Sequence, residues 1–352
     1  MLKFIKAAAV AAFALSATVA SAQTKLDGSG ASFPAPIYQR WITEYNKANP
    51  SVQINYSSVG SGGGIKDVTN KSVAFAGSDA PLSKKERAAI QGEVLHIPTV
   101  AGAVVPAFNL PGFNGELHLT GEVIAKIYLG EIKAWNDPAI AGINAGAALP
   151  ATPITPVWRT DGSGTTFVFT NYLATQSNDF ITKIGPGKQV RWPAGVGGKG
   201  NEGVTAAIQN LPGALGYIEL NYAVDNKVAF AAVKNKAGKF VKATDAAVVA
   251  AGAAATKKMT APAALAVDIW NQDGEAAYPI SAFTYILVYK DLGYLGDANK
   301  AKELVKFLAW QQSDAASKIA TSLTYAPADA AVKAKIAEAI NAITFNGQPI
   351  AK

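Results

Sequence analysis

The sequence contains no cysteine and only two histidines in 352 residues. Without cysteine the chain can have no disulfide bond, no thiolate zinc site, no cysteine nucleophile and no cysteine that carries a lipid anchor. His96 and His118 show no metal-binding spacing and are interpreted as structural or surface residues, and no dense cluster of carboxylates is present. The sequence therefore predicts no metal site and no cofactor.

The signatures of several catalytic and nucleic-acid-binding sites are also missing. Gly198-Lys199 is followed by Gly200, where a phosphate-binding P-loop needs serine or threonine. Neither Ser61 nor Ser163 has the glycine two positions earlier that the nucleophile elbow of serine hydrolases requires. The formal charge is +7, but the basic residues are scattered and form no stripe with interleaved aromatic residues. We expect neither an enzyme nor a nucleic-acid-binding protein.

Long hydrophobic segments are absent as well, because no apolar run approaches the roughly 20 residues that span a bilayer. The run from Ala7 to Leu15 follows Lys3 and Lys6, and it precedes the small residues Ala20-Ser21-Ala22. A basic start, a short apolar core and small residues before a cleavage site are typical of a secretory signal peptide. Residues 1–22 are therefore predicted to be a signal peptide; the alternative is a buried helix at the start of the fold.

The remaining residues, 23–352, are numerous enough for a large core and for two domains. Apolar residues at helical spacing occur within 37–45, 123–128, 168–173 and 301–308, and a helix is also predicted over 65–70. Ser32 and Thr120 are predicted to cap the first two of these helices. Strands are predicted at 52–56, 73–78, 100–108, 154–158, 215–218 and 286–289. This alternation indicates an α/β protein with largely parallel sheets.

Three loops rich in glycine and small polar residues lie between a strand and a helix: Gly28–Phe33, Gly60–Gly64 and Asp161–Thr166. The first N–H groups of a helix have no partner within it, and the helix dipole places partial positive charge there. Glycines allow close approach of the backbone and hydroxyls donate further hydrogen bonds, so such loops bind sulfate or phosphate. The interpretation is an oxyanion site, although a single loop of this kind is usually an ordinary turn.

Two charged residues beside these loops refine the hypothesis. Arg159 can meet an oxyanion with two parallel hydrogen bonds while Asp161 holds its side chain, unless the two form only a surface ion pair. Asp79 follows an apolar strand, at the end where α/β proteins bind ligands. A carboxylate repels an anion unless that anion carries a proton, as hydrogen phosphate does and sulfate does not. The alternative role for Asp79 is to cap the following helix.

Taken together, the motifs resemble the family of periplasmic phosphate-binding proteins of the high-affinity phosphate ABC importer, often called PstS. The matching segments are 28–36, 60–64, 77–83, 128–132, 159–165, 197–201 and 211–217. The resemblance implies a two-domain α/β periplasmic-binding-protein fold, type II-like, with the ligand in the interdomain cleft. Domain I is expected at 23–101 plus 277–352 and domain II at 102–276. Nothing is carried over to 246–258, the least similar segment.

The same resemblance implies a set of phosphate contacts, with Asp79 as proton acceptor and Asp161 paired to Arg159. They are Ala31, Ser32, Phe33, Ser61 and Asp79 in domain I, and Arg159, Asp161, Ser163, Gly164 and Thr165 in domain II. The expected function is a monomeric periplasmic receptor that captures inorganic phosphate and delivers it to an inner-membrane ABC permease and its ATPase. The alternatives are a receptor for another tetrahedral oxyanion, a secreted phosphatase, and a phosphate sensor or adhesin.

Overall fold

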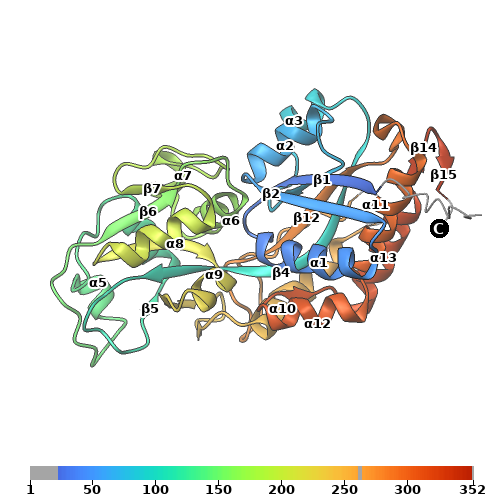
Figure 1. The fold of residues 1–352 in the computed structure, drawn as a ribbon. Helices are drawn as coiled ribbons and strands as arrows, with labels where there is room; N and C mark the ends of the chain where they lie inside the picture. The colour runs from blue at the N-terminus through green and yellow to red at the C-terminus, as the bar shows by residue number, and fades with distance from the viewer. Residues whose placement is uncertain (1–22, 261–263, 351–352) are drawn as a thin grey trace, which may run out of the picture.

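The computed structural model describes residues 23–260 and 264–350 as an α/β protein of two lobes, joined by the long strand β4 (Val94–Phe108) (Figure 1). Lobe I contains the N-terminal elements up to β4 together with the C-terminal elements from β12 onwards, and lobe II contains the elements α4 to α9. The predicted signal peptide, 1–22, lies outside the described residues. Among the helices of the described ranges, none is long and apolar enough to cross a membrane.

The sheet of lobe I has a parallel half and an antiparallel half. Strand β1 (Thr24–Gly30) pairs in parallel with β2 (Val52–Ser58) and with β3 (Phe75–Ser78). Strand β12 (Ser281–Tyr289) runs antiparallel to both β3 and β4. The expectation of largely parallel sheets is therefore wrong at the centre of the molecule, although it holds within the βαβ units on either side.

Lobe II repeats this arrangement on the other half of β4. Strand β6 (Thr155–Arg159) pairs in parallel with β7 (Val196–Gly198) and with β8 (Ala214–Glu219), and β8 runs antiparallel to β4. The two halves thus form one continuous sheet of ten strands. The short strands are β5 (His118–Leu119), β9 (Ala229–Phe230), β10 (Ala232–Lys234), β11 (Phe240–Val241), β13 (Ala326–Pro327), β14 (Thr344–Phe345) and β15 (Gln348–Pro349).

Helices cover both faces of this sheet (Figure 1). Those of lobe I are α1 (Ala35–Ala48), α2 (Ser61–Thr69), α3 (Lys84–Ala89), α11 (Ala298–Trp310), α12 (Asp314–Ser322) and α13 (Ala330–Asn341). Those of lobe II are α4 (Gly121–Tyr128), α5 (Pro138–Ala141), α6 (Gly164–Ala174), α7 (Asn178–Lys183), α8 (Gly200–Asn210) and α9 (Leu220–Asp225). Helix α10 (Asp245–Ala255) packs against β4, β12 and β13, and 3₁₀ turns lie at Thr256–Lys258 and Gly293–Leu295.

The local signals at helix starts give one correct prediction and two wrong ones. Thr120 caps α4, as predicted, by accepting from the N–H of Val123. Ser32 does not cap α1, because the helix begins at Ala35 and the Ser32 hydroxyl is engaged elsewhere. Helix α2 begins at Ser61, before the predicted start at Ile65, since Gly60 adopts a positive φ of 84° and turns the chain directly into the helix.

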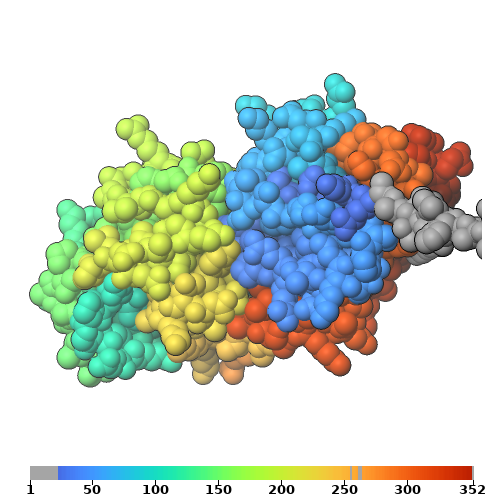
Figure 2. Space-filling model, viewed as in Figure 1, coloured from blue at the N-terminus to red at the C-terminus, as the bar shows by residue number. Residues whose placement is uncertain are grey.

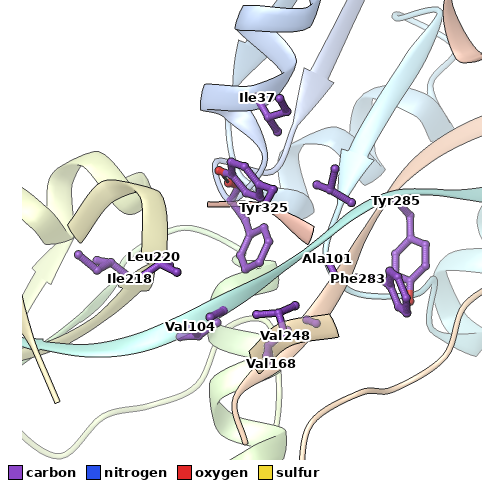
Figure 3. Close-up of a cluster of buried hydrophobic side chains, with 14 of the residues drawn as sticks. Ile37, Ala101, Val104, Val168, Ile218, Leu220, Val248, Phe283, Tyr285 and Tyr325 are labelled. Atoms are coloured by element: carbon purple, nitrogen blue, oxygen red, sulfur yellow. Dashed lines mark hydrogen bonds between the residues drawn. The ribbon is translucent and has the colours of Figure 1, made fainter. Parts of the chain in front are cut away.

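The junction of the two lobes is built on β4, whose 15 residues are all buried. Its first part, up to Ala103, pairs with β12, and its last part, from Val104 onwards, pairs with β8. Figure 3 shows Ala101 and Val104 of β4 among apolar side chains from both lobes, including Val168 of α6 and Phe283 of β12. The apolar core is therefore continuous from one lobe to the other and holds the loops of both lobes in register.

Candidate oxyanion-binding site

The predicted site residues converge where the two lobes meet, and nearly all of them are buried. The loops of the two lobes are in direct contact, because the N–H of Gly62 donates to the carbonyl of Gly162 at 2.7 Å. Gly164 lies against lobe I so closely that a Cβ at this position would be 2.4 Å from Asp79 Oδ2 and from Ser61 Oγ. The space-filling view shows the two lobes touching along this seam (Figure 2).

The first loop of lobe I provides backbone N–H groups just before α1. Within the described part of the chain, the N–H groups of Ser32 and Phe33 donate to no other residue. The carbonyl of Phe33 accepts from the Tyr325 hydroxyl at 2.7 Å, which fixes the loop from behind. Ala31 differs from these two residues, since its N–H donates to the Gly77 carbonyl at 2.9 Å and its own carbonyl accepts from a tyrosine hydroxyl. The backbone of Ala31 is therefore already engaged.

Asp79 has the most unusual environment in the site. Its Oδ1 accepts from the Thr284 hydroxyl at 2.8 Å, whereas its Oδ2 is buried and has no hydrogen-bond partner among the described residues. Burial raises the pKa of Asp79 to about 7, against the lowering effects of the Thr284 hydrogen bond and the Arg159 charge. It caps no helix, because Ser83 is the N-cap of α3, so the capping alternative is wrong. Asp79 thus presents one buried acceptor atom.

Ser61 is the first residue of α2 and is fully buried beside Asp79. Its hydroxyl oxygen accepts from the N–H of Asp79 at 3.2 Å. A hydroxyl group that accepts still has its own proton to donate. The start of α2 consequently adds a hydroxyl donor and a helix N-terminus next to the single acceptor.

Arg159 and Asp161 form a buried pair, not a surface pair, because the Arg159 side chain is only 1% exposed. Arg159 Nε donates to Asp161 Oδ1 at 2.8 Å, Nη2 donates to Oδ2 at 2.5 Å, and Nη1 donates to Thr165 Oγ1 at 3.2 Å. A guanidinium has five N–H bonds, so one on Nη1 and one on Nη2 remain for a ligand. Burial acts to raise the pKa of Asp161, but the hydrogen bonds and charge of Arg159 outweigh it and hold the pKa below its usual value.

The start of α6 completes the site from lobe II. Ser163 caps this helix by accepting from the N–H of Thr166 at 2.9 Å, and its hydroxyl proton remains available. The N–H groups of Gly164 and Thr165 belong to the first turn and have no partner within the helix. Together with Arg159, this helix start forms a dense set of donors opposite Asp79.

Sequence reasoning missed two residues of the site, Asn201 and Thr284. Asn201 is fully buried in the first turn of α8, and it donates to Ser32 and to Thr165. The glycine-rich loop before it was a usable signal, because it also leads from a strand into a helix. Thr284 lies within the uniformly buried strand β12, where no local pattern distinguishes it.

Contacts on both sides of the site hold the lobes together. Lys188 of lobe II donates to Oε1 and Oε2 of Glu86 in α3, at 2.6 and 2.7 Å. On the other side, the hydroxyl of Tyr222 in α9 donates to the carbonyl of Ser32 at 2.7 Å. The structure is therefore that of a closed arrangement, in which donors from both lobes are buried at the same junction.

The donors and the acceptor define what the site can hold. It combines unpaired backbone N–H groups, four hydroxyl groups and an arginine edge with one buried carboxylate oxygen. Such a set suits a small tetrahedral oxyanion that carries one proton. In the ranges 23–260 and 264–350, no group of three histidine, aspartate or glutamate side chains is placed to hold a metal ion.

Comparisons with known proteins match most of the chain. A family model described as a PBP superfamily domain matches residues 15–315. The chain is 41% identical over 327 residues to a phosphate-binding protein PstS of Pasteurella multocida, covering 92% of each chain. It is 42% identical over 304 residues to a phosphate-binding protein PstS of Xylella fastidiosa, covering 86% of this chain and 81% of the relative.

A solved structure supports the fold in particular. It is a high-affinity periplasmic phosphate-binding protein bound with phosphate, and it superposes with a TM-score of 0.71 at 24% identity. The match covers 89% of this chain and 93% of the solved chain. The two-lobed α/β fold expected from the sequence is thereby confirmed.

Proposed function

The chain belongs to the PBP superfamily and, within it, to the phosphate-binding proteins PstS, and on this premise we propose that it is a receptor that encloses inorganic phosphate between its two lobes. The observation that carries the proposal is the buried Oδ2 of Asp79, which has no partner among the described residues and lies beside Ser61 and Gly164. A buried acceptor of this kind is costly unless a ligand satisfies it.

The mechanism of capture is the replacement of water around the anion by fixed donors. Removing an ion from water is unfavourable unless charge and hydrogen bonds compensate for it. Here the starts of α2 and α6 supply N–H groups and partial positive charge, and Arg159 supplies the full positive charge. The contributing groups are the proposed contacts Ser32, Phe33, Ser61, Asp79, Arg159, Ser163, Gly164 and Thr165, with Asp161 orienting Arg159. Ala31, the remaining proposed contact, belongs to the same loop as Ser32 and Phe33.

Asp79 provides selectivity between oxyanions of the same shape. Thr284 occupies Oδ1, so Oδ2 is left to accept the proton of hydrogen phosphate. Sulfate has no such proton at neutral pH, and it would place an unprotonated oxygen against a carboxylate. The discrimination is expected to reach several kcal/mol, because the loss of the hydrogen bond adds to charge repulsion.

Sulfate binding should consequently depend on pH in one direction. Below about pH 7 the free Asp79 is protonated and can donate to sulfate, whereas above it the carboxylate repels the anion. With one linked proton, the sulfate affinity should fall by about tenfold per pH unit above that value. Asp79→Asn, whose amide donates at any pH, should bind sulfate equally from pH 5.5 to 8.5. Calorimetry from pH 5.5 to 8.5 measures the sulfate affinity of both proteins. A wild-type sulfate affinity that does not change with pH would show that Asp79 does not have this role.

Closure is proposed to occur by rotation of the lobes about β4 and about the chain segment near Ala277. The proposed domains are 23–101 plus 277–352 for domain I and 102–276 for domain II. Support comes from the exchange of partners along β4 between Ala103 and Val104, and from the contacts of Glu86 with Lys188 across the seam.

The biological setting is proposed on the same premise. The chain acts in the periplasm, exported by a signal peptide at 1–22 and not lipidated, and it works as a monomer. It hands phosphate to an inner-membrane ABC permease and its ATPase complex. Support comes from the basic and apolar start of the sequence and from the absence of cysteine.

A secreted phosphatase is the rival function. It would need an activated nucleophile, yet His96 accepts from the N–H of Leu82 at 3.1 Å and His118 contacts Glu116, so each has a partner other than a site serine. To decide, the purified mature protein is titrated with phosphate by calorimetry and incubated with a phosphate monoester. We expect single-site binding and no release of phosphate; turnover above the protein-free rate would establish the enzyme instead.

A further inference from the structure

Asn201 occupies a position that the proposed phosphate site does not yet explain. It lies at the start of α8 in lobe II and is fully buried, and its side chain reaches Ser32 of lobe I. We propose that Asn201 is a positioning residue: when the lobes meet, it directs the hydroxyl protons of Ser32 and Thr165 towards the anion. This inference rests on the proposed phosphate site.

The hydrogen bonds of Asn201 fix the orientation of its side-chain amide. Its Oδ1 accepts from the N–H of Glu219 at 2.9 Å, and a backbone N–H can only donate. The NH₂ group must therefore point the other way, where Nδ2 donates to Ser32 Oγ at 2.9 Å and to Thr165 Oγ1 at 3.1 Å. The backbone N–H of Asn201 adds a second bond to Ser32 Oγ at 3.0 Å.

These bonds determine what the two hydroxyl groups can do. A hydroxyl oxygen accepts two hydrogen bonds and donates one. Ser32 Oγ already receives two N–H groups from Asn201, and Thr165 Oγ1 receives one from Asn201 and one from Arg159. Both oxygens are thus saturated as acceptors, and neither proton has an acceptor within the described residues. Each hydroxyl is left as a pure donor, which is the form that an anion needs.

The same geometry couples the donor set to closure. Ser32 belongs to lobe I, whereas Asn201 and Thr165 belong to lobe II, so the bonds between Asn201 and Ser32 exist only when the lobes are together. In a separated arrangement, the Ser32 hydroxyl is free to rotate and to accept. Closure therefore converts the Ser32 hydroxyl into an oriented donor without further movement of the ligand. This orientation lowers the entropy cost of the hydrogen bond from Ser32 to the anion.

A double-mutant cycle separates orientation from simple structural support. Asn201→Ala should weaken phosphate binding by about tenfold in the wild-type background, a difference of about 1.4 kcal/mol. In a Ser32→Ala background there is no Ser32 hydroxyl to orient, so the same substitution should have an effect at least threefold smaller. A purely structural role would give the same loss of affinity in both backgrounds, and that result would overturn the inference.

A second variant keeps the test decisive if Asn201→Ala does not fold. Asn201→Asp retains the shape and the bond with the N–H of Glu219, but its carboxylate accepts from both hydroxyls and turns their protons away from the anion. We expect it to bind phosphate at least tenfold more weakly than Asn201→Ala. Affinity equal to that of wild type would contradict the inference.

A matched control comes from Asn144, another buried asparagine of lobe II that bonds to His118 and Ile140, outside the site. Asn144→Ala should lower the melting temperature and leave the phosphate Kd unchanged. The two levels of the argument fail differently: a wild-type protein that does not bind phosphate rejects the proposed function, whereas wild-type binding with equal losses in both backgrounds rejects only the role of Asn201.

Discussion

Replacing Arg159 by alanine is expected to weaken phosphate binding by about 100-fold, or roughly 3 kcal/mol, because the only full positive charge proposed to touch the anion is removed. The buried guanidinium offers one free N–H on each of Nη1 and Nη2, and it is held by Asp161. The substitution also leaves the Asp161 charge unpaired beside the ligand, which adds repulsion. Calorimetric titration with phosphate measures the loss.

Arg40→Ala is the matched control for this substitution. Arg40 lies on α1, its side chain is 61% exposed, and it pairs with Glu44 one turn along the helix. Exposed pairs of this kind contribute little, so the phosphate Kd should not change. An Arg159→Ala protein that binds within twofold of wild type would show that Arg159 is not a ligand contact.

Gly164→Ala is expected to have the largest effect of all, a loss of phosphate affinity of about 1,000-fold or roughly 4 kcal/mol. The added methyl group would lie 2.4 Å from Asp79 Oδ2 and from Ser61 Oγ, and 2.6 Å from Asp79 Cβ. Asp79 cannot easily yield, because Thr284 holds its other oxygen. The lobes should then fail to meet, and the bonds from the opposite lobe are lost together.

Two measurements check this prediction. Calorimetry gives the affinity, and small-angle X-ray scattering should show that phosphate no longer changes the radius of gyration of the variant. Gly252→Ala in α10 is the control, because Phe283, at 4.0 Å, is the nearest described side chain to a Cβ there. It should bind phosphate normally and be at least as stable as wild type. Normal binding by Gly164→Ala would show that the two lobes need not approach this closely.

The local features of the site were predictable from the sequence. A glycine-rich loop before a helix and an arginine two residues before Asp161 are short-range patterns, and the structure places them between the end of β6 and the start of α6. Their physical effect depends only on neighbouring residues, so a single segment is enough to recognise them.

The long-range contacts were not predictable in this way. The sequence predicts a helix cap at Ser32, but its hydroxyl bonds to Asn201, 169 residues away. Asp79 bonds to Thr284, 205 residues away, and this contact leaves only one of its oxygens as an acceptor. The first pair forms because the two lobes meet, and the second forms because the chain returns to lobe I after lobe II. No periodicity within a segment contains that information.

The strands at the centre show a different limit. β4 and β12 are buried along their whole length, so they have no alternation of polar and apolar residues to mark their ends. The predicted strands were therefore too short, and the antiparallel pairing between them was missed. No element is predicted within 246–258, although most of helix α10, which Thr244 caps, lies in this segment.

The most direct test of the account is a calorimetric titration of the mature protein with phosphate at pH 8, with and without a large excess of sulfate. At this pH, Asp79 is expected to be mainly ionised, since its pKa is raised only to about 7. The account predicts the same phosphate Kd in both titrations, because the unprotonated sulfate cannot satisfy Asp79 Oδ2. A phosphate Kd that rises in proportion to the sulfate concentration would contradict it.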